Sequence, residues 1–322
     1  MLFRISHSFP LLEGHAMNQP SASPAGPESN ETSCRPPSSS RQVSGLEKPG
    51  ISVDEAFLLL AAAGAQEAVR RAGQVDPHAS PEVFHKLRVA LRRLRSLWWA
   101  YRPLLDETDA ERWRDRFKEL AAAAGKTRDW DIVRELLVAY ESARHPRVSL
   151  LTFVDERRRD AVSFSCRTIH EAGLNGILER ATDSAKGQLA SSTSRPPLAE
   201  FARDRVKLAE KALAKRIKHA TLHEVSGYAA LHDVRIAGKK LRYLLEFFSP
   251  VLDVSHQATI ERLKNAQDEL GALNDIVASE ALLRECASRF GQPDAVDDAI
   301  AYLKDQKKRR IHRAYEMLRT AR

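Results

Sequence analysis

The sequence has few of the residues that build metal sites, disulfide frameworks and membrane spans. Its 322 residues include three widely spaced cysteines, Cys34, Cys166 and Cys286. No CxxC or Cys/His ligand spacing occurs, which argues against a zinc site, and an odd, scattered set suits a reducing compartment. No apolar run approaches the ~20 residues that a membrane span needs. We therefore expect a cytoplasmic protein with no bound metal and no cofactor.

The start of the chain lacks a convincing signal peptide, because polar and charged residues such as Arg4 interrupt its apolar positions. Met1 and Met17 both stay open as the start of translation. Residues 17–50 are rich in Ser, Pro, Gly and Asn and nearly free of large apolar side chains. Such a segment cannot bury enough surface to fold, so we predict a disordered tail over residues 1–50.

Glycine and proline are sparse beyond this tail, where Ala, Leu, Arg and Glu dominate and favour helix. The formal net charge is +8. The tail holds four basic and four acidic residues, so the excess positive charge lies in the folded part of the chain. This distribution indicates an anionic partner.

Start and stop signals divide residues 51–322 into helices. Ser80, Pro81 and Glu82 form a strong helix start, and Thr108 to Glu111 reads as a capping box. The expected helices cover about 52–71, 81–102, 108–144, 147–172, 198–220, 227–248, 256–290 and 294–320. Residues 174–197 have weak periodicity and are expected to connect two halves.

One stretch occurs twice, as HKLRVALRRLR from His85 to Arg95 and as HDVRIAGKKLR from His232 to Arg242. At 100° per residue, each copy places its histidine and three cations within an arc of about 80°. We call these arcs the basic stripes; they consist of His85, Arg88, Arg92 and Arg95, and of His232, Arg235, Lys239 and Arg242. An apolar stripe lies beside each, made of Leu87, Leu91, Leu94 and Trp98, and of Val234, Gly238, Leu241 and Leu245.

A single helix of this kind is usually just a solvated charged face. Acidic residues that could pair with the stripes at i±4 are nearly absent, however, so the like charges would repel one another. The arrangement also recurs in a second helix, histidine included. These two features favour a pair of cationic stripes that bind a linear polyanion.

The repeat extends beyond the stripes. An offset of 147 residues relates His85 to His232, Pro103 to Pro250 and Pro146 to Pro293. An offset of 146 relates Gly125 to Gly271, which brings Arg128-Asp129 opposite Asn274-Asp275. We predict an all-α fold of two pseudosymmetric four-helix bundles around a basic central groove or cavity. Repeat 1 covers about 51–175 and repeat 2 about 198–322.

Three segments carry a family resemblance: FHKLRVALRRLR, LHDVRIAGKKLRYLLEFFSPVL and LKNAQDELGALNDIVASEALL. With the weaker AAAAGKTRDWDIV, they resemble the CHAD family, the "conserved histidine α-helical domain", over about residues 50–322. The resemblance implies two four-helix bundles, a basic cavity that binds inorganic polyphosphate and, as in several members, association with polyphosphate granules. The chain departs from the family at Gly238, where a larger residue is usual, and at the bulky Trp98-Trp99 pair.

The resemblance and the stripes together predict the polyphosphate-binding residues. They are His85, Arg88, Arg92, Arg93, Arg95, His232, Arg235, Lys239, Lys240 and Arg242. Secondary basic candidates, each also readable as a solvated face, are Arg157, Arg158, Arg203, Lys207, Lys211, Lys218, Lys307 and Lys308. Asp129 and Asp275 are expected in helix-face ion pairs, and Trp98, Trp99, Tyr243, Phe247 and Phe248 in the core.

The leading interpretation is a non-catalytic polyphosphate-binding protein. A non-specific nucleic-acid binder fits the charge but lacks a reader motif, and a phosphate-chain hydrolase lacks a carboxylate cluster for Mg²⁺. His85 and His232 are either ligand-binding groups or satisfied structural residues. Protonation of the histidines predicts tighter binding as the pH falls from 7.5 to 6. The oligomeric state stays open.

Overall fold

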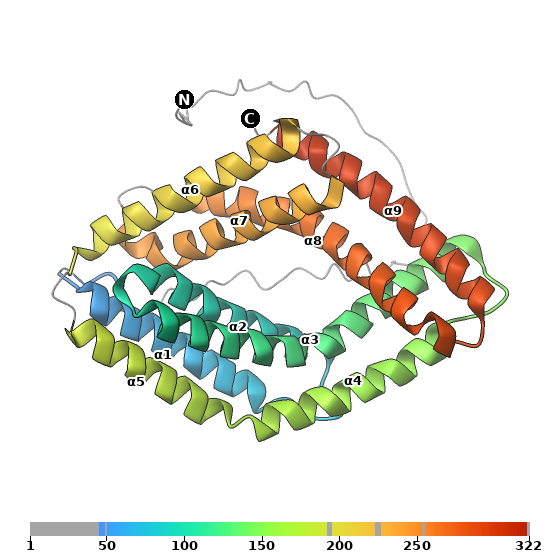
Figure 1. The fold of residues 1–322 in the computed structure, drawn as a ribbon, viewed down its shortest axis with the longest axis horizontal. Helices are drawn as coiled ribbons and strands as arrows, with labels where there is room; N and C mark the ends of the chain where they lie inside the picture. The colour runs from blue at the N-terminus through green and yellow to red at the C-terminus, as the bar shows by residue number, and fades with distance from the viewer. Residues whose placement is uncertain (1–44, 49, 192–194, 223–226, 253–254, 321–322) are drawn as a thin grey trace, which may run out of the picture. The chain divides into compact units, whose positions relative to one another are not determined.

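The computed structural model describes residues 45–48, 50–191, 195–222, 227–252 and 255–320, so most of the predicted tail lies outside the described residues. Within these ranges the chain forms helices and no strand, which confirms the all-α prediction. The α-helices are α1 (Val53–Ala72), α2 (Pro81–Tyr101), α3 (Glu107–Arg144), α4 (Leu151–Glu171), α5 (Leu174–Ser191), α6 (Leu198–Leu222), α7 (Gly227–Phe248), α8 (Gln257–Cys286) and α9 (Pro293–Thr320) (Figure 1). Among them, none is long and apolar enough to span a membrane.

Local signals set many of the helix ends. Ser52 and Glu55 form a reciprocal capping box at the start of α1. Pro81 occupies the first turn of α2, where its missing N–H costs nothing, although the Ser80 side chain makes no cap hydrogen bond. The helix α2 ends at Tyr101, directly before the 3-10 turn that contains Pro103. These boundaries agree with the predicted ones within one or two residues.

Other boundaries differ from the prediction: α4 begins at Leu151 rather than near 147, and α8 ends at Cys286 rather than near 290. The cap of α3 is Asp106, whose side chain accepts a hydrogen bond from the Asp109 N–H, so the predicted capping box from Thr108 is wrong. Most of the expected connection is the helix α5, which packs on α1. Leu46 is 2% exposed and belongs to the core, so the folded part begins before residue 51.

The helices pack in sequential pairs within each half. In the first half α1 contacts α2, α2 contacts α3 and α3 contacts α4, and in the second half α6, α7, α8 and α9 follow the same order. Four further contacts join the halves: α2 with α7, α3 with α8, α3 with α9 and α1 with α6. One hydrophobic cluster crosses the boundary, because Val133 and Leu137 of α3 pack with Leu283 of α8 and Leu303 of α9. The two repeats therefore share hydrophobic core.

The apolar stripes of the two repeated segments are buried as predicted. All eight of their residues are classed as buried, among them Leu87, Leu91 and Leu245 with no exposed area. Burying these side chains holds α2 and α7 in a defined rotation about their axes. That rotation determines where the adjacent basic stripes lie.

Candidate anion-binding site

The two basic stripes lie close enough that the charges of one lower the pKa values of the other. The helices α2 and α7 contact each other. Burial is the largest cause of the lowered pKa values of Arg235 and Lys239 on α7, and Arg92 on α2 is the next. Arg88 of α2 also lowers both pKa values. The structure therefore brings together four predicted binding residues from two segments 147 residues apart.

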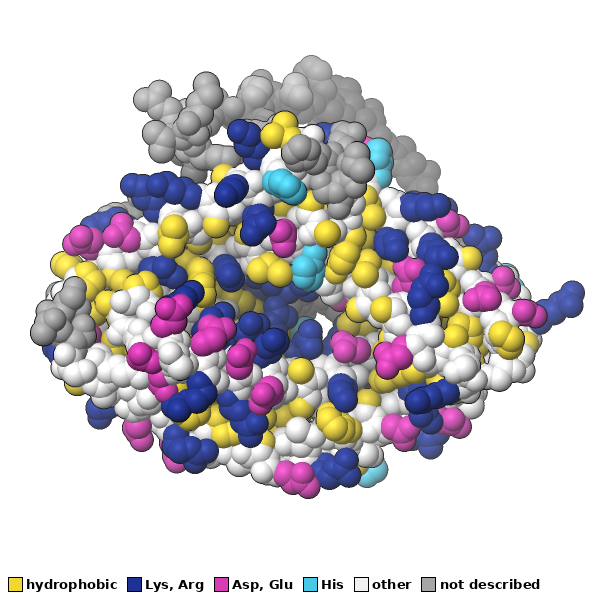
Figure 2. Space-filling model, in the orientation of Figure 1, with side chains coloured by type: hydrophobic (Ala, Val, Ile, Leu, Met, Phe, Trp, Pro, Cys, Tyr) yellow, Lys and Arg dark blue, Asp and Glu magenta, His cyan; other side chains and the backbone are white. Residues whose placement is uncertain are grey.

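These four cations have no carboxylate partner within ion-pair distance among the described residues. They are Arg88, Arg92, Arg235 and Lys239, and we call them the central cluster. The space-filling view shows Lys and Arg side chains gathered along a hollow near the middle of the molecular face (Figure 2). In addition, the Nε atoms of Arg95 and Arg235 are buried without a hydrogen-bond partner, as are those of Arg114, Arg157 and Arg205 off the stripes. Buried donors are normally satisfied, so such atoms indicate a ligand or solvent partner.

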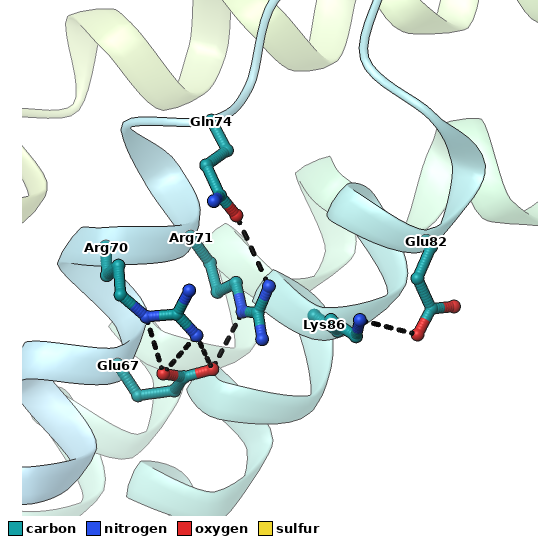
Figure 3. Close-up of polar contacts among 6 residues, drawn as sticks. All are labelled: Glu67, Arg70, Arg71, Gln74, Glu82 and Lys86. Atoms are coloured by element: carbon teal, nitrogen blue, oxygen red, sulfur yellow. Dashed lines mark hydrogen bonds and ion pairs between the residues drawn. The ribbon is translucent and has the colours of Figure 1, made fainter. Parts of the chain in front are cut away.

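Cations outside the stripes behave differently. Glu67 binds both Arg70 and Arg71 at the end of α1, and Lys86 lies 3.2 Å from Glu82 at the start of α2 (Figure 3). Lys86 belongs to the same repeated segment as Arg88, yet it lies off the basic stripe. Local i, i+3 and i, i+4 acids thus neutralise these three cations, whereas the central cluster has no such acid at ion-pair distance within the described residues.

Two acidic residues contribute to the cluster from α3 and α8. The charge of Asp275 on α8 favours the charged forms of Arg88 and Arg235 and so raises their pKa values. The charge of Asp129 on α3 does the same for Arg88. Burial is the main cause that raises the pKa of Asp129, and the charge of Asp275 adds to it. Neither carboxylate lies within ion-pair distance of a cation among the described residues. The expectation that they form helix-face ion pairs is therefore wrong.

Gly125 in the middle of α3 makes room for an arginine of the cluster. A Cβ atom at this position would collide with the Arg88 guanidinium. At the matching Gly271 of α8, a Cβ would meet nothing within 4 Å. The sequence register that pairs the two glycines therefore does not extend to their surroundings, and only Gly125 serves the site by its missing side chain.

The two histidines have different surroundings. His232 Nδ1 lies 3.1 Å from the Tyr228 hydroxyl, which donates to the Asn274 side-chain oxygen at 3.1 Å. For His85 no hydrogen bond is found within the described part of the chain. Burial lowers the pKa of both histidines, so their protonation needs a lower pH than an ordinary histidine does.

Arg93 and Arg242 bind a buried carboxylate. Arg93 Nη1 of α2 lies 3.0 Å from Glu246 of α7, and Arg242 Nε lies 3.6 Å from the other oxygen of the same carboxylate. The Glu246 side chain is only 7% exposed. The bond from Arg93 therefore joins α2 to α7, whereas the pair with Arg242 lies within α7.

A second group of cations surrounds Trp99. Lys240 and Arg205 lie over its ring, each 4.9 Å from the centroid, and Arg205 also donates to the Trp99 carbonyl. Burial is the largest cause that lowers the pKa of Lys240, followed by Arg114 and Arg95. Trp99 is partly exposed, whereas Trp98 and the other three aromatic residues expected in the core are buried.

The secondary basic candidates lie apart from the central cluster. Arg158 binds Asp131 at 2.5 Å between α4 and α3, and Lys307 binds Glu280 at 2.8 Å between α9 and α8. Arg157 pairs with Asp160, and Lys308 is exposed on α9. The remaining candidates, Arg203, Lys207, Lys211 and Lys218, are exposed on α6.

Several residues of the site were not predicted from the sequence. The pKa of Arg88 depends on the charges of Arg128, Asp129 and Asp275. The pKa of Arg235 depends on Tyr228 as well as on Asp275. The register of Arg128-Asp129 with Asn274-Asp275 was the available signal for three of these positions. Within the described residues, no group of three or more His, Cys, Asp and Glu side chains could hold a metal ion.

The CHAD domain sequence profile matches residues 59–284 of the chain. The chain is similar to the solved CHAD domain from the plant Ricinus communis, with a TM-score of 0.72 and 24% identity over 84% of this chain and 93% of that one. It is also similar to PptA from Streptomyces chartreusis, with a TM-score of 0.57 and 18% identity over 84% of this chain and 99% of that one. At these identities the two structures show a shared fold. No curated protein matches the sequence.

Proposed function

This chain belongs to the CHAD domain family, and we propose that it binds inorganic polyphosphate in the site between α2 and α7. The observation that carries the proposal is the central cluster. It collects three arginines and a lysine from two helices and leaves them without carboxylate ion pairs within the described residues. Gathering like charges in a half-buried site costs free energy, and a bound polyanion would offset that cost.

The chemistry of the cluster suits a phosphate chain. The planar guanidinium donates two parallel hydrogen bonds to phosphate oxygens, whereas a lysine acts as a compact point charge. The cluster holds Arg88, Arg92 and Arg235 beside Lys239, so several neighbouring phosphates find donors at once. The Nε atom of Arg95, which is buried without a hydrogen-bond partner, lies along the same stripe as Arg88 and Arg92 and extends this set of donors.

Polyphosphate fits the site better than a nucleic acid does. Single-stranded nucleic acids bind through stacking of bases on open aromatic rings as well as through backbone charge. Trp99 and Tyr228 are partly exposed aromatic residues beside the cations. Lys240 and Arg205 lie over the Trp99 ring, and the Tyr228 hydroxyl is hydrogen-bonded to His232 and Asn274. Phosphate chains carry no bases and need no stacking surface, so a site made of cations alone suffices for them.

We also propose that the protein acts as a non-catalytic binding module in the cytoplasm and associates with polyphosphate granules. The cations of the site can hold a chain, and its two acidic groups, Asp129 and Asp275, are embedded among those cations. Phosphate release in the presence of Mg²⁺ would contradict the non-catalytic part of this proposal. Fluorescence microscopy of the tagged protein in polyphosphate-rich cells would test the association with granules.

A salt titration tests the binding proposal. Affinities for long polyphosphate and for single-stranded DNA are measured at matched charge concentration for the wild type and for Arg88→Ala/Arg235→Ala. For a single-stranded polyanion, the log–log slope is about −0.7 per phosphate neutralised. We expect tighter binding of polyphosphate than of DNA, and a slope flattened by about one to two units in the double variant.

The matched control is Lys118→Ala/Lys186→Ala, which removes one exposed cation from α3 and one from α5. Circular dichroism confirms that all variants remain helical. Equal losses in both double variants, together with equal affinity for DNA, would mean that diffuse surface charge accounts for binding. The proposed site between α2 and α7 would then be wrong.

A further inference from the structure

The contact that joins Arg93 to Glu246 has a counterpart elsewhere in the molecule, and the counterpart lacks its acid. The offset of 147 residues that relates the two histidines also relates Arg93 to Lys240, Arg95 to Arg242 and Trp99 to Glu246. In the first copy, Arg93 of α2 and Arg242 of α7 both face the Glu246 carboxylate. In the counterpart, Lys240 of α7 lies over the Trp99 ring of α2, 4.9 Å from its centroid. A neutral ring thus occupies the position of the negative charge.

Three cations at or beside Trp99 have no carboxylate partner among the described residues. They are Arg95 of α2, Arg205 of α6 and Lys240 of α7, and together with Trp99 we call them the Trp99 site. Two arginines near Lys240 are already neutralised. Arg114 pairs with Glu111. Arg216 pairs with Asp233 at 2.7 Å. The positive charge that remains uncompensated is therefore that of the Trp99 site.

The arginines of the Trp99 site are held in place, yet each keeps a donor without a partner. The Arg205 guanidinium lies 4.9 Å from the centroid of the Trp99 ring, and its Nη2 donates to the Trp99 carbonyl at 3.2 Å. That carbonyl belongs to the last turn of α2, where backbone oxygens carry partial negative charge. The Nε atoms of Arg95 and Arg205 are buried and have no hydrogen-bond partner. Because buried donors are normally satisfied, these atoms indicate a ligand or solvent partner.

The Trp99 ring does not replace a carboxylate. An aromatic ring attracts a cation through its quadrupole but adds no negative charge, and here Lys240 and Arg205 share one ring. Burial is the largest cause that lowers the pKa of Lys240, four arginines follow, and no acid is among these causes. The free protein therefore keeps net positive charge at this place.

We propose that the Trp99 site is a second binding site, which holds a phosphoryl oxyanion where the counterpart has the Glu246 carboxylate. Phosphoryl oxygens accept charge-assisted hydrogen bonds from Arg95, Arg205 and Lys240, as carboxylate oxygens do. Such an oxyanion has two sources: a small free phosphate compound, or a phosphate unit of a chain that continues from the central cluster. The second source rests on the proposed function.

The Trp99 site adjoins the central cluster along α2. Arg92, Arg95 and Trp99 follow one another at steps of three and four residues, so they lie on one face of the helix. At 1.5 Å per residue, Trp99 lies about 10 Å beyond Arg92 along the helix axis. Burial is the main cause that lowers the pKa of Arg95, and the charge of Arg92 contributes to it. A chain that leaves the central cluster along this face therefore meets the Trp99 site next.

The variant Trp99→Glu tests the site by supplying the missing acid. The new carboxylate should pair with Lys240 and Arg95 and so exclude a second anion. Calorimetry should show that affinity for long-chain polyphosphate falls about ten- to hundred-fold, the value of one charge-assisted hydrogen bond. Trp99→Phe keeps an aromatic ring and adds no charge, so it should bind within about two-fold of the wild type. Wild-type affinity for long-chain polyphosphate and for tripolyphosphate in Trp99→Glu would overturn the proposal.

Two further variants separate the site from net charge and from misfolding. Ala301→Glu adds the same charge at an exposed position of α9, a helix that contributes no side chain to the Trp99 site. It should keep wild-type affinity, and a loss equal to that of Trp99→Glu would overturn the proposal. Lys240→Gln removes a cation without adding an acid and should lose about ten-fold in affinity. It carries the test if circular dichroism shows that Trp99→Glu is not helical.

A double variant shows whether the two residues act at one place. In Trp99→Glu/Lys240→Gln the two losses of affinity should not add, because each change alone already disables the same donor. Fully additive losses would mean that Trp99 and Lys240 act at separate places and would overturn the shared site.

Tryptophan fluorescence distinguishes the two sources of the oxyanion. Trp99→Phe identifies the part of the emission change that comes from Trp99. If small phosphates bind at the Trp99 site by themselves, tripolyphosphate changes this emission in Arg88→Ala/Arg235→Ala as it does in the wild type. If the site takes only a continuing chain, long-chain polyphosphate changes the emission and tripolyphosphate does not. Both results support the site, and a Trp99 emission that responds to neither ligand would overturn it.

The same variants separate this inference from the proposed function. If Trp99→Glu loses affinity for long-chain polyphosphate while Arg88→Ala/Arg235→Ala keeps it, the central cluster is not the site and the Trp99 site stands. The reverse pattern would overturn the Trp99 site and leave the proposed function intact.

Discussion

Arg93 of α2 donates a hydrogen bond to Glu246 of α7 across the boundary between the two repeats, at 3.0 Å. The carboxylate is nearly buried, and its second oxygen faces Arg242 at 3.6 Å. One acid thus links two predicted binding residues, one from each copy of the motif. The same two helices are also joined by Arg93 over the Phe247 ring and by Lys240 over the Trp99 ring. The pair therefore supports the geometry of the site as well as the fold.

Removing this carboxylate should destabilise the protein. In Glu246→Gln, both arginines lose their charged partner in a poorly solvated place. We expect the free energy of unfolding to fall by roughly 1–3 kcal/mol, less than for a fully buried pair because Arg93 is partly exposed. Urea denaturation measures the change. The control is Glu119→Gln, which breaks the exposed pair with Arg116 and should cost at most about 0.5 kcal/mol. Equal effects in the two variants would contradict a structural role for Glu246.

Filling the space at Gly125 should weaken ligand binding without unfolding the chain. In Gly125→Ala, the new methyl group displaces the guanidinium end of the Arg88 side chain. We expect polyphosphate affinity to fall about ten-fold, the value of one charge-assisted hydrogen bond. Helix propensity should raise stability by up to about 1 kcal/mol. Binding and thermal melting are measured together.

The matched variant is Gly271→Ala, where the methyl group meets nothing within 4 Å. It should gain the same helix stability and keep its affinity for polyphosphate. A loss of affinity in both variants, or in neither, would show that Arg88 does not need the space beside Gly125.

Binding of polyphosphate should take up a proton at pH 7.5. The pKa of Lys239 is about 6 in the free protein, and a bound phosphate raises it by favouring the charged amine. The ligand thus binds the protonated form more tightly, and affinity falls as the pH rises from 6 to 9. Isothermal titration calorimetry in two buffers with different ionisation enthalpies counts the protons.

The same experiment distinguishes Lys239 from the histidines. Burial moves the titration of His85 and His232 below that of an ordinary histidine, so His85→Gln/His232→Gln should retain the uptake at pH 7.5. In Lys239→Arg the uptake should disappear, because arginine is already charged in the free protein. Loss of the uptake in the histidine variant would assign the proton to the imidazoles instead.

The unliganded protein should become more stable as the pH rises above 6. The pKa of Lys239 is lower in the folded chain than in the unfolded chain, where the usual value is 10.5. Between these two values the unfolded state binds more protons, so the free energy of unfolding increases with pH. Below pH 6 the folded state must accommodate the charged amine. Urea denaturation at pH 6.5 and 9 should show a larger gain for the wild type than for Lys239→Met. Parallel pH profiles of the two proteins would contradict the lowered pKa.

Local sequence signals determined most of the secondary structure and one face of the site. The capping box at Ser52 and the prolines at 81 and 103 act within a few residues of themselves, so their effects could be predicted without a tertiary structure. The helical period also placed the basic stripes beside apolar stripes that are buried as predicted. Signals of this kind failed where two possible N-cap residues lay close together, as Asp106 and Thr108 do at the start of α3. They also failed where the hydrophobic periodicity was weak, as in α5.

Contacts between distant segments were decided by the packing alone. The sequence shows a glycine at 125 and an acid at 246, but nothing local indicates that the first accommodates Arg88 or that the second binds Arg93. The same holds for Lys239, since its spacing predicted a permanent cation like its counterpart Arg92. Its lowered pKa arises from burial and from arginines of another helix, and both depend on how α2 packs against α7. Charge and period are properties of a segment, whereas proton affinity is a property of the place to which the fold brings it.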